Sequence, residues 1–220
     1  MKGTDSVPTL DALVGVTASL VSDALDALGL REHTVDPAIR PLVPGPALVG
    51  VAVPILIVPS SRIAEPPYET EIRALEDMRP GEVPVYCTAG DVGAALWGEL
   101  FTCAALGRGA TGAVVDGPIR DVRQIRELGF PVFARGFSPL DTLGRAEAEA
   151  FRVPATCGGV RIEPGDIVVG DEDGLVVVPR DVAPDVSAAV DEKLRGERSA
   201  RIDLLAGETL GEVWRRYGVL

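Results

Sequence analysis

Apolar runs of strand length alternate with amphipathic helical segments through the middle of this 220-residue chain, and this order limits the fold more than any other feature. Between the runs, the spacing predicts a helix near 68–78, a second ending near Gly107 or Gly109, and a third over DVRQIRELG. Strands and helices in this order indicate a layered α/β domain. The runs that suit buried strands are ALVGVAVPILIVP (47–59), PVYCT, ATGAVVDG and FPVFARG.

The flanking segments extend this domain. Thr17 can cap a helix over TASLVSDALDALG, which Gly29 ends. The segments REHTVDPAIRPLVPGP and SPLDTLGRAEAEAF are expected to be loops. CGGVRIEPGDIVVGDEDGLVVVP has strand-like alternation with turn signals, and the charged C-terminus from Asp181 onward is predicted to be helical. With no repeat or flexible linker, and with 46% hydrophobic residues, residues 1–220 are expected to form a single domain.

The charge balance narrows the set of partners. Thirty-three acidic residues against 21 basic ones give a net charge of −12, which repels phosphate backbones, so no nucleic acid is expected. No apolar run reaches the roughly 18 residues of a membrane span, and MKGTDSVPTLDALVG lacks the features of a signal peptide. A soluble, cytoplasmic protein without a membrane partner is therefore expected.

The cysteines and the single histidine narrow the chemistry. Cys87, Cys103 and Cys157 are scattered without a CxxC pair, which indicates reduced, buried thiols. His33 is the only histidine and lies among charged loop residues, so one chain cannot build a multi-histidine zinc site. Any metal is expected on oxygen ligands, which favours magnesium or manganese.

Two motif matches are expected to be structural. GRGATG fits the GxGxxG pattern, but a helix precedes it and a strand follows it, the reverse of the order in a dinucleotide-binding loop. DEDG (171–174) resembles the start of a calcium loop, yet it lies between two alternating runs and suits a hairpin turn.

Two short stretches carry candidate chemistry. Trp97-Gly98-Glu99-Leu100 lies near a predicted helix start, where free amides can bind a carboxylate and Gly98 allows close approach to the backbone. Arg120-Asp121 follows a buried strand, at the edge where ligands usually bind in α/β sheets. Arg120 offers a planar fork for a carboxylate, and Asp121 offers a hard oxygen ligand for a divalent ion.

Local structure gives an alternative explanation for part of this pattern. Gly98 and Glu99 also suit an ordinary amphipathic helix with an exposed acid. Asp121 is a good N-cap for VRQIRELG, with Gln124 in the position that completes a capping box. Capping does not explain Arg120, because a cation at a helix N-terminus opposes the helix dipole. Two further acids, Asp91 and Asp116, lie close in sequence to the same edge and also suit turns.

The order of three blocks resembles one family, the 4-hydroxy-4-methyl-2-oxoglutarate aldolases and regulators of ribonuclease E activity. The blocks are TASLVSDALDALG, ALWGELFTCAALGRGATGAVVDGPIRDVRQIRELGFPVFARG and CGGVRIEPGDIVVGDEDGLVVVP. The resemblance implies an α/β/β/α sandwich similar to swivelling phosphohistidine domains. It also implies homotrimers or dimers of trimers with sites at subunit interfaces.

For the site, the resemblance implies that Arg120 holds the carboxylate of a pyruvate-like group and that Asp121 ligates magnesium or manganese. The amides of Gly98, Glu99 and Leu100 would contact the substrate, and the Glu99 carboxylate would lie near the water ligands of the metal. Regulators lack the Asp after the Arg, so Asp121 favours an enzyme. The aldolase signature has an acid where this chain has Gln124, which leaves the substrate open.

Together these features predict a divalent-metal-dependent class II pyruvate aldolase, a lyase acting on a small 2-oxo acid. The substrate would be a 4-hydroxy-2-oxo acid such as 4-hydroxy-4-methyl-2-oxoglutarate, with oxaloacetate decarboxylation as a related activity. Arg120, Asp121 and Glu99 are the predicted catalytic residues. A Schiff base is not expected, because the only lysines are Lys2 and Lys193. The alternative is a non-catalytic, protein-binding regulator, and no glycine-rich loop follows a first strand as a methyltransferase would need.

Overall fold

The alternating runs form four parallel strands in a computed structural model that describes residues 8–45, 47–90 and 92–219. The strands are β2 (Leu48–Pro59), β3 (Glu82–Thr88), β4 (Ala113–Ile119) and β5 (Val132–Phe137). They are joined by the helices α3 (Glu69–Glu76), α4 (Glu99–Gly107) and α5 (Val122–Leu128). Their near-continuous apolar sequences fit strands that are covered on both faces.

The long strand β2 joins these parallel strands to antiparallel ones. Its first half pairs with β9 (Ile167–Asp171), and its second half pairs with β6 (Ala146–Phe151) through a register shift between Leu56 and Ile57. The sheet runs in the order β1-β5-β4-β3-β2-β9-β10, with β1 (Arg40–Pro41) and β10 (Gly174–Val178) as the ends of this path. A separate pair consists of β7 (Ala155–Cys157) and β8 (Val160–Ile162).

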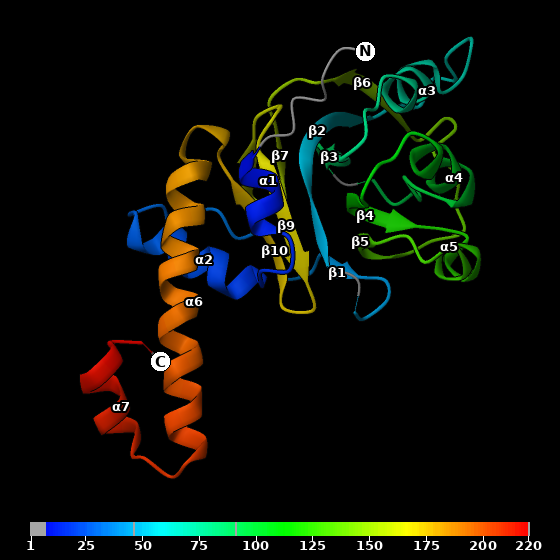
Figure 1. Cartoon of the computed structure of the whole chain (residues 1–220). Coiled ribbons are helices and arrows are strands. Elements are labelled where there is room, and N and C mark those ends of the chain that lie inside the picture. Colours follow the sequence, from blue (N-terminus) through cyan, green and yellow to red (C-terminus); the bar gives the residue numbers. More distant parts are fainter. Residues whose placement is uncertain (1–7, 46, 91, 220) are drawn as a thin grey trace.

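Helices cover both outer faces, as Figure 1 shows. One apolar cluster joins β2–β5 to α3, α4 and α5. A second lies between the parallel strands and the strands β7 to β10. A third joins β9 and β10 to α1 (Pro8–Leu13), α2 (Ala18–Ala27) and α6 (Ala183–Leu205). This order of helices, strands, strands and helices confirms the α/β class.

Most local predictions are confirmed. Thr17 caps α2 by accepting a hydrogen bond from the Leu20 amide, and DEDG forms the β9–β10 hairpin. In GRGATG, Gly107 ends α4, Gly109 follows it with φ of +78°, and a Cβ on Gly112 would lie 2.4 Å from Leu48 Cδ1. These glycines therefore serve the turn and its packing.

Two predictions are wrong. AEAEAF was expected to lie in a loop, but it forms strand β6, in which the alternating Ala146 and Ala148 are buried. The glutamates between the alanines make the segment polar in composition, so its apolar face was not recognised from the sequence. Cys87 and Cys157 are buried free thiols as expected, but Cys103 is exposed on α4.

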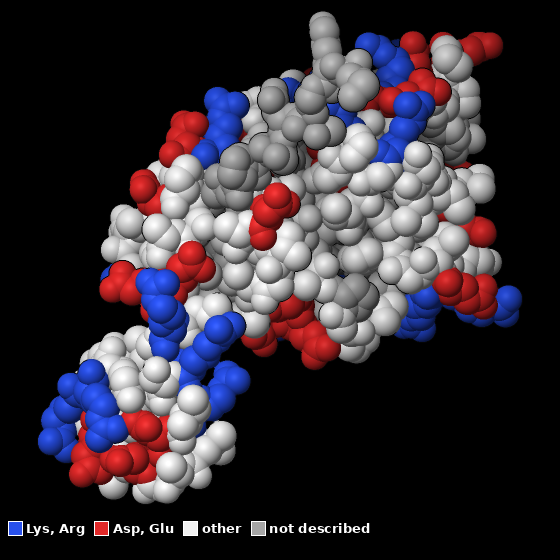
Figure 2. All heavy atoms as spheres, in the orientation of Figure 1, with Lys and Arg blue, Asp and Glu red and all other residues white. Residues whose placement is uncertain are grey.

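The C-terminal helices form an arm. The helix α6 projects away from the sheets, and α7 (Leu210–Tyr217) packs beside its far end (Figure 1). Tyr217 Oη donates a 2.8 Å hydrogen bond to Asp203, and Arg216 also pairs with Asp203. On the face in Figure 2, basic and acidic side chains are interleaved along this arm. Among the helices of the described ranges, none is long and apolar enough to cross a membrane.

Candidate functional site

The backbone beyond the end of β4 brings the two candidate stretches together. The Leu96 amide donates to Pro118 O, and the Arg120 amide donates to Trp97 O, both at 2.9 Å. Trp97 and Ile119 form a parallel bridge, so the chain entering α4 runs beside the end of β4. This pairing places Gly98, the N-cap of α4, directly against Arg120 and Asp121.

Asp121 does not cap its own helix, so the local interpretation of this residue is wrong. It occupies the N-cap position of α5, but its backbone is left-handed (φ 56°, ψ 35°) and its side chain makes no capping bond there. Its Oδ2 instead accepts a 3.2 Å hydrogen bond from the Glu99 amide, at the start of α4. A left-handed non-glycine residue costs about 1–3 kcal/mol and persists where its surroundings enforce it, often at functional sites.

Gly98 is required here by space. Its backbone is extended (φ −155°), which other residues can adopt. A Cβ at this position, however, would lie 2.7 Å from Asp121 Oδ2 and 3.3 Å from Arg120 Cγ. Gly98 was expected to let a ligand approach the backbone closely, and in the structure the group that lies against it is the protein's own Asp121 carboxylate.

The start of α4 is held by a buried polar chain. Trp97 is 1% exposed, and its Nε1 donates to Thr102 Oγ1 at 2.7 Å. Thr102 Oγ1 in turn donates to Gly98 O at 3.0 Å. The indole also packs edge-on against Tyr86, with 5.3 Å between ring centroids. These contacts fix Gly98 and the free amides at the start of the helix.

Arg120 lies between two carboxylates. Its Nε is 3.7 Å from Asp121 Oδ2, and a terminal nitrogen is 3.6 Å from Asp141 Oδ2. Asp141 Oδ2 also accepts a 2.9 Å hydrogen bond from Tyr68 Oη. Each ion pair is partly exposed and therefore weak. Together they explain how a cation is accommodated next to a helix start.

Tyr68 and Asp141 were not predicted, since they lie in segments with no motif and meet only in the folded chain. Partial burial and the bond to Asp141 raise the pKa of Tyr68, so its hydroxyl stays protonated. Burial tends to raise the pKa of Asp141, but the bond from Tyr68 and the charge of Arg120 outweigh it and lower that pKa. Asp141 is therefore a permanent anion near neutral pH.

These residues line a cavity of about 230 Å³, the volume of about eight water molecules at roughly 30 Å³ each. Arg120, Asp121 and Gly98 form one polar part of its wall. Leu100 is 79% exposed, and Glu99, which is half-buried, contacts Asp121 through its backbone. The size suits a small organic acid. The remaining lining residues are Tyr68, Ile72, Ala95, Leu96, Trp97, Leu100, Phe101, Asp141 and Thr142.

Arg120 and Asp121 also line a more open hollow of about 450 Å³. Its other lining residues are Ile119, Val122, Phe137, Ser138 and Pro139. The Arg-Asp pair is thus common to the linings of two spaces. Of the two, only the smaller one also includes Gly98, so it is the stronger candidate for substrate binding.

A metal ion bound in this cavity would have one protein carboxylate, that of Asp121, as a ligand. Across the described ranges, no three His, Cys, Asp or Glu side chains are grouped to hold an ion. Magnesium is often bound through one or two carboxylates, with waters and substrate oxygens completing the shell. One Asp121 oxygen accepts the Glu99 amide, which leaves its second oxygen for a ligand. Asp121 fits this role.

Other predicted acids lie elsewhere. Asp116 pairs with Arg135, and its Oδ2 accepts a 2.7 Å hydrogen bond from the Gly158 amide, which gives it a structural role. Asp91 lies outside the described residues, as does Lys2. Lys193 pairs with Asp23 on the other helical layer.

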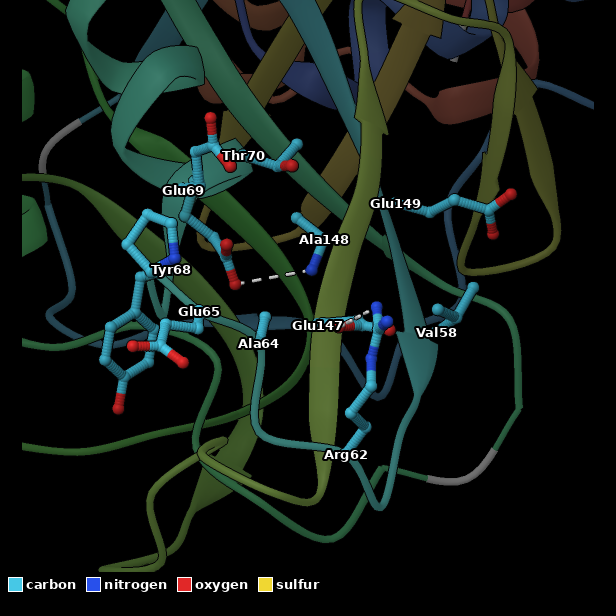
Figure 3. Close-up of a pocket in the computed structure, with 12 residues that line it drawn as sticks. Val58, Arg62, Ala64, Glu65, Tyr68, Glu69, Thr70, Glu147, Ala148 and Glu149 are labelled. Atoms are coloured by element: carbon cyan, nitrogen blue, oxygen red, sulfur yellow. Dashed lines mark hydrogen bonds and ion pairs between the residues drawn. The ribbon is translucent and has the colours of Figure 1, made fainter.

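A third space, a cavity of about 430 Å³, lies between α3 and β6 (Figure 3). Its one basic lining residue is Arg62, which reaches to within 3.7 Å of Glu147. Glu71 is 6% exposed and accepts a 3.3 Å bond from the Ala148 amide, and burial raises its pKa. This acidic lining disfavours an anionic substrate. Its further acids are Glu65, Glu69, Glu147 and Glu149.

The fold and site define a layered α/β protein with an Arg-Asp pair beside a helix N-terminus, at the carboxyl edge of parallel strands. The family model described as "RraA-like: Aldolase/RraA" matches residues 18–177. The chain belongs to this family.

Relatives differ in the activity their names give. A Halalkalibacterium halodurans protein named "Putative 4-hydroxy-4-methyl-2-oxoglutarate aldolase" is 34% identical over 165 residues, covering 75% of this chain and 73% of that protein. The structure of a Pseudomonas syringae pv. tomato protein has a TM-score of 0.84 at 29% identity, covering 96% of this chain and 99% of that one. Streptomyces coelicolor RraAS2, described as an unusual member of the RNase ES inhibitor RraA family, has a TM-score of 0.80 at 29% identity, with 91% and 98% covered. Family membership alone therefore does not decide between an enzyme and an inhibitor.

Proposed function

We propose that this protein is a divalent-metal-dependent aldolase that releases pyruvate from 4-hydroxy-2-oxo acids, such as 4-hydroxy-4-methyl-2-oxoglutarate, and also decarboxylates oxaloacetate. The observation that carries the proposal is the convergence of Arg120, Asp121 and Gly98 at one wall of a small cavity. A scaffold that only binds a protein partner has no need for an enforced left-handed Asp121 beside an arginine.

In this mechanism Arg120 binds the substrate carboxylate through its planar fork. Asp121 holds magnesium or manganese, which when bound supplies Lewis-acid polarisation of the 2-oxo group. The N-terminus of α4, where Gly98, Leu100 and Phe101 line the same cavity, favours negative charge. The Trp97–Thr102–Gly98 chain keeps this N-terminus in place.

Cleavage breaks the C3–C4 bond, and its electron pair moves toward C3 to give a pyruvate enolate, which is then protonated at C3. In the aldol reaction the 4-hydroxyl also gives its proton to a water molecule that acts as the base, so that C4 leaves as a carbonyl. Oxaloacetate loses C4 as carbon dioxide without that deprotonation. Arg120 is positioned to stabilise the negative charge that develops on the bound 2-oxo acid.

Gln124 lies in the first turn of α5 and is half-buried. Its amide can donate and accept hydrogen bonds but adds no charge. The proposed chemistry therefore depends on Asp121 for its protein carboxylate.

The test is pyruvate release from a panel of 4-hydroxy-2-oxo acids and oxaloacetate, with magnesium or manganese, using two Asp121 variants. Asp121→Asn keeps a side-chain oxygen for the Glu99 amide and tolerates the left-handed backbone, so it should fold normally but lose metal-dependent turnover. Asp121→Ala should lose the same turnover. It should also lose about 1 kcal/mol of stability, because the Glu99 amide at the start of α4 loses its acceptor, as happens when a helix-capping residue is removed. The matched control is Asp181→Asn, because Asp181 has an 88% exposed side chain in another layer.

A wild-type protein that consumes no member of the panel, or an Asp121→Asn variant with full activity, would contradict the aldolase proposal. The first outcome would favour the regulator alternative, which similarity to the inhibitor-family structure supports.

The expected homotrimer, or dimer of trimers, also stays a proposal. Its support is the exposed apolar surface of the arm, since such surface often marks an intersubunit contact. Light scattering after size exclusion would measure the assembly. The exposed side chains are Ile202, Leu205, Leu210 and Trp214, exposed by 68%, 83%, 57% and 51%.

A further inference from the structure

The two carboxylates beside Arg120 both stay at a distance from its guanidinium group. The Arg120 Nε lies 3.7 Å from Asp121 Oδ2, and a terminal nitrogen lies 3.6 Å from Asp141 Oδ2. A charge-assisted hydrogen bond between an arginine and a carboxylate is shorter, at about 2.7–2.9 Å. Neither acid has therefore closed on the guanidinium.

A second donor already occupies each of the two oxygen atoms that face Arg120. Asp121 Oδ2 accepts the 3.2 Å hydrogen bond from the Glu99 amide, and Asp141 Oδ2 accepts the 2.9 Å bond from Tyr68 Oη. The Glu99 donor belongs to the backbone, whereas the Tyr68 hydroxyl is a side-chain group that can be removed alone. The restraint on Asp141 can therefore be tested without a change to the backbone.

Both ends of the contact between Tyr68 and Asp141 are anchored at the wall of the smaller cavity, which Arg120 also lines. Asp141 forms a parallel bridge with Ala95, in the segment that leads to Gly98. Tyr68 has a left-handed backbone (φ 61°, ψ 16°) at the start of α3. Such a conformation is unfavourable for a non-glycine residue and persists where the surroundings enforce it. The hydrogen bond thus joins two backbone positions that are themselves held in place.

We propose that Tyr68 is a positioning residue that keeps the Asp141 carboxylate from closing on Arg120, so that the guanidinium stays free for the carboxylate of a 2-oxo acid. The inference rests on the proposed function for the identity of this ligand. It applies to substrates with one or two carboxylates, because it concerns only the carboxylate beside the 2-oxo group. With the divalent ion proposed on Asp121, the charged groups of the cavity lining keep a net positive charge, which Asp141 reduces but does not reverse.

Tyr68→Phe tests the proposal because it removes the hydroxyl and keeps the ring. Without this donor, Asp141 can form a closer pair with Arg120, and a partly exposed pair of this kind competes with the ligand by about two- to fivefold. Calorimetry in the presence of magnesium should therefore show pyruvate binding weakened by about two- to fivefold. The KM for a cleaved 4-hydroxy-2-oxo acid should rise by a similar factor, with kcat little changed.

A second substitution distinguishes this role from a purely structural one. Asp141→Asn keeps an acceptor for Tyr68 but has no charge with which to capture Arg120. Alone, it should bind pyruvate at least as tightly as wild type, and the double variant Tyr68→Phe/Asp141→Asn should regain wild-type affinity. A tyrosine that only supported the fold would show no such rescue. The matched control is Tyr217→Phe, which removes a 2.8 Å hydrogen bond of the same kind to Asp203 on the arm and should leave pyruvate binding unchanged.

Unchanged pyruvate affinity and KM in Tyr68→Phe would overturn the inference and leave the aldolase proposal standing. Weaker binding by Asp141→Asn alone, or no recovery in the double variant, would also overturn it. If no hydroxy acid is cleaved but Tyr68→Phe weakens pyruvate binding and the double variant restores it, the aldolase proposal fails and the positioning role survives. A wild-type protein that binds no pyruvate would contradict both proposals.

Discussion

Gly98→Ala would test the geometry of the site by adding one methyl group. The new Cβ would lie 2.7 Å from Asp121 Oδ2, whereas ordinary contacts begin at 3.4 Å, so the carboxylate must move by about 0.7 Å. That movement also weakens the 3.2 Å bond from the Glu99 amide. Misplacing a reacting group by about 1 Å can cost 10²-fold in rate, so kcat/KM should fall about ten- to a hundredfold.

Stability should hardly change, because Gly98 has an extended backbone that alanine adopts. Restricting the unfolded chain contributes about 0.4–1 kcal/mol in favour of alanine, which offsets part of the crowding. Pyruvate release would be measured together with thermal unfolding. The matched control is Gly107→Ala at the end of the same helix, where nothing lies within 4 Å of the new Cβ. This control should keep full activity and unfold at the same or a higher temperature.

The reasoning is wrong if Gly98→Ala keeps wild-type kcat/KM. It is also wrong if the variant loses activity only in proportion to a large drop in Tm, since that would make Gly98 a folding residue. A selective loss of activity with a normal Tm, absent in Gly107→Ala, is the expected result.

Two further predictions concern stability. Because burial raises the pKa of Glu71 above its ordinary 4.5, the folded state keeps a proton that the unfolded chain has released, and wild-type stability falls as pH rises through the folded pKa. Glu71→Gln keeps the acceptor for Ala148, so its Tm should exceed that of wild type at neutral pH, and the gap should close below pH 4.5. Arg152 forms two 2.9 Å bonds to Glu82, whose side chain is 9% exposed. Arg152→Ala should therefore lower the free energy of unfolding by about 3 kcal/mol in urea titrations, and an unchanged urea midpoint would contradict this assignment.

The sequence predicted the strands and helices that have strong periodicity, and it singled out Gly98 and Arg120 as candidate site residues, which the fold brings together. It failed at β6, where alternating Ala and Glu resemble a polar loop until a neighbouring strand covers the alanines. It also missed Tyr68 and Asp141, which are separated by 73 positions and join only through tertiary contacts. Local patterns cannot specify such pairs, because either residue alone suits an ordinary loop.

Asp121 shows how a correct local rule can lead to a wrong contact. Its residue type and position predicted a cap for α5, and the backbone does start that helix there. The left-handed conformation instead turns the carboxylate to the first amide of α4, so one acid links the starts of two helices. Arg120, which capping could not explain, then lies between this acid and Asp141. Arg120 makes two weak, partly exposed ion pairs rather than one strong one. Its guanidinium can therefore replace these contacts with a bidentate pair to a substrate carboxylate, as a carboxylate-binding site requires.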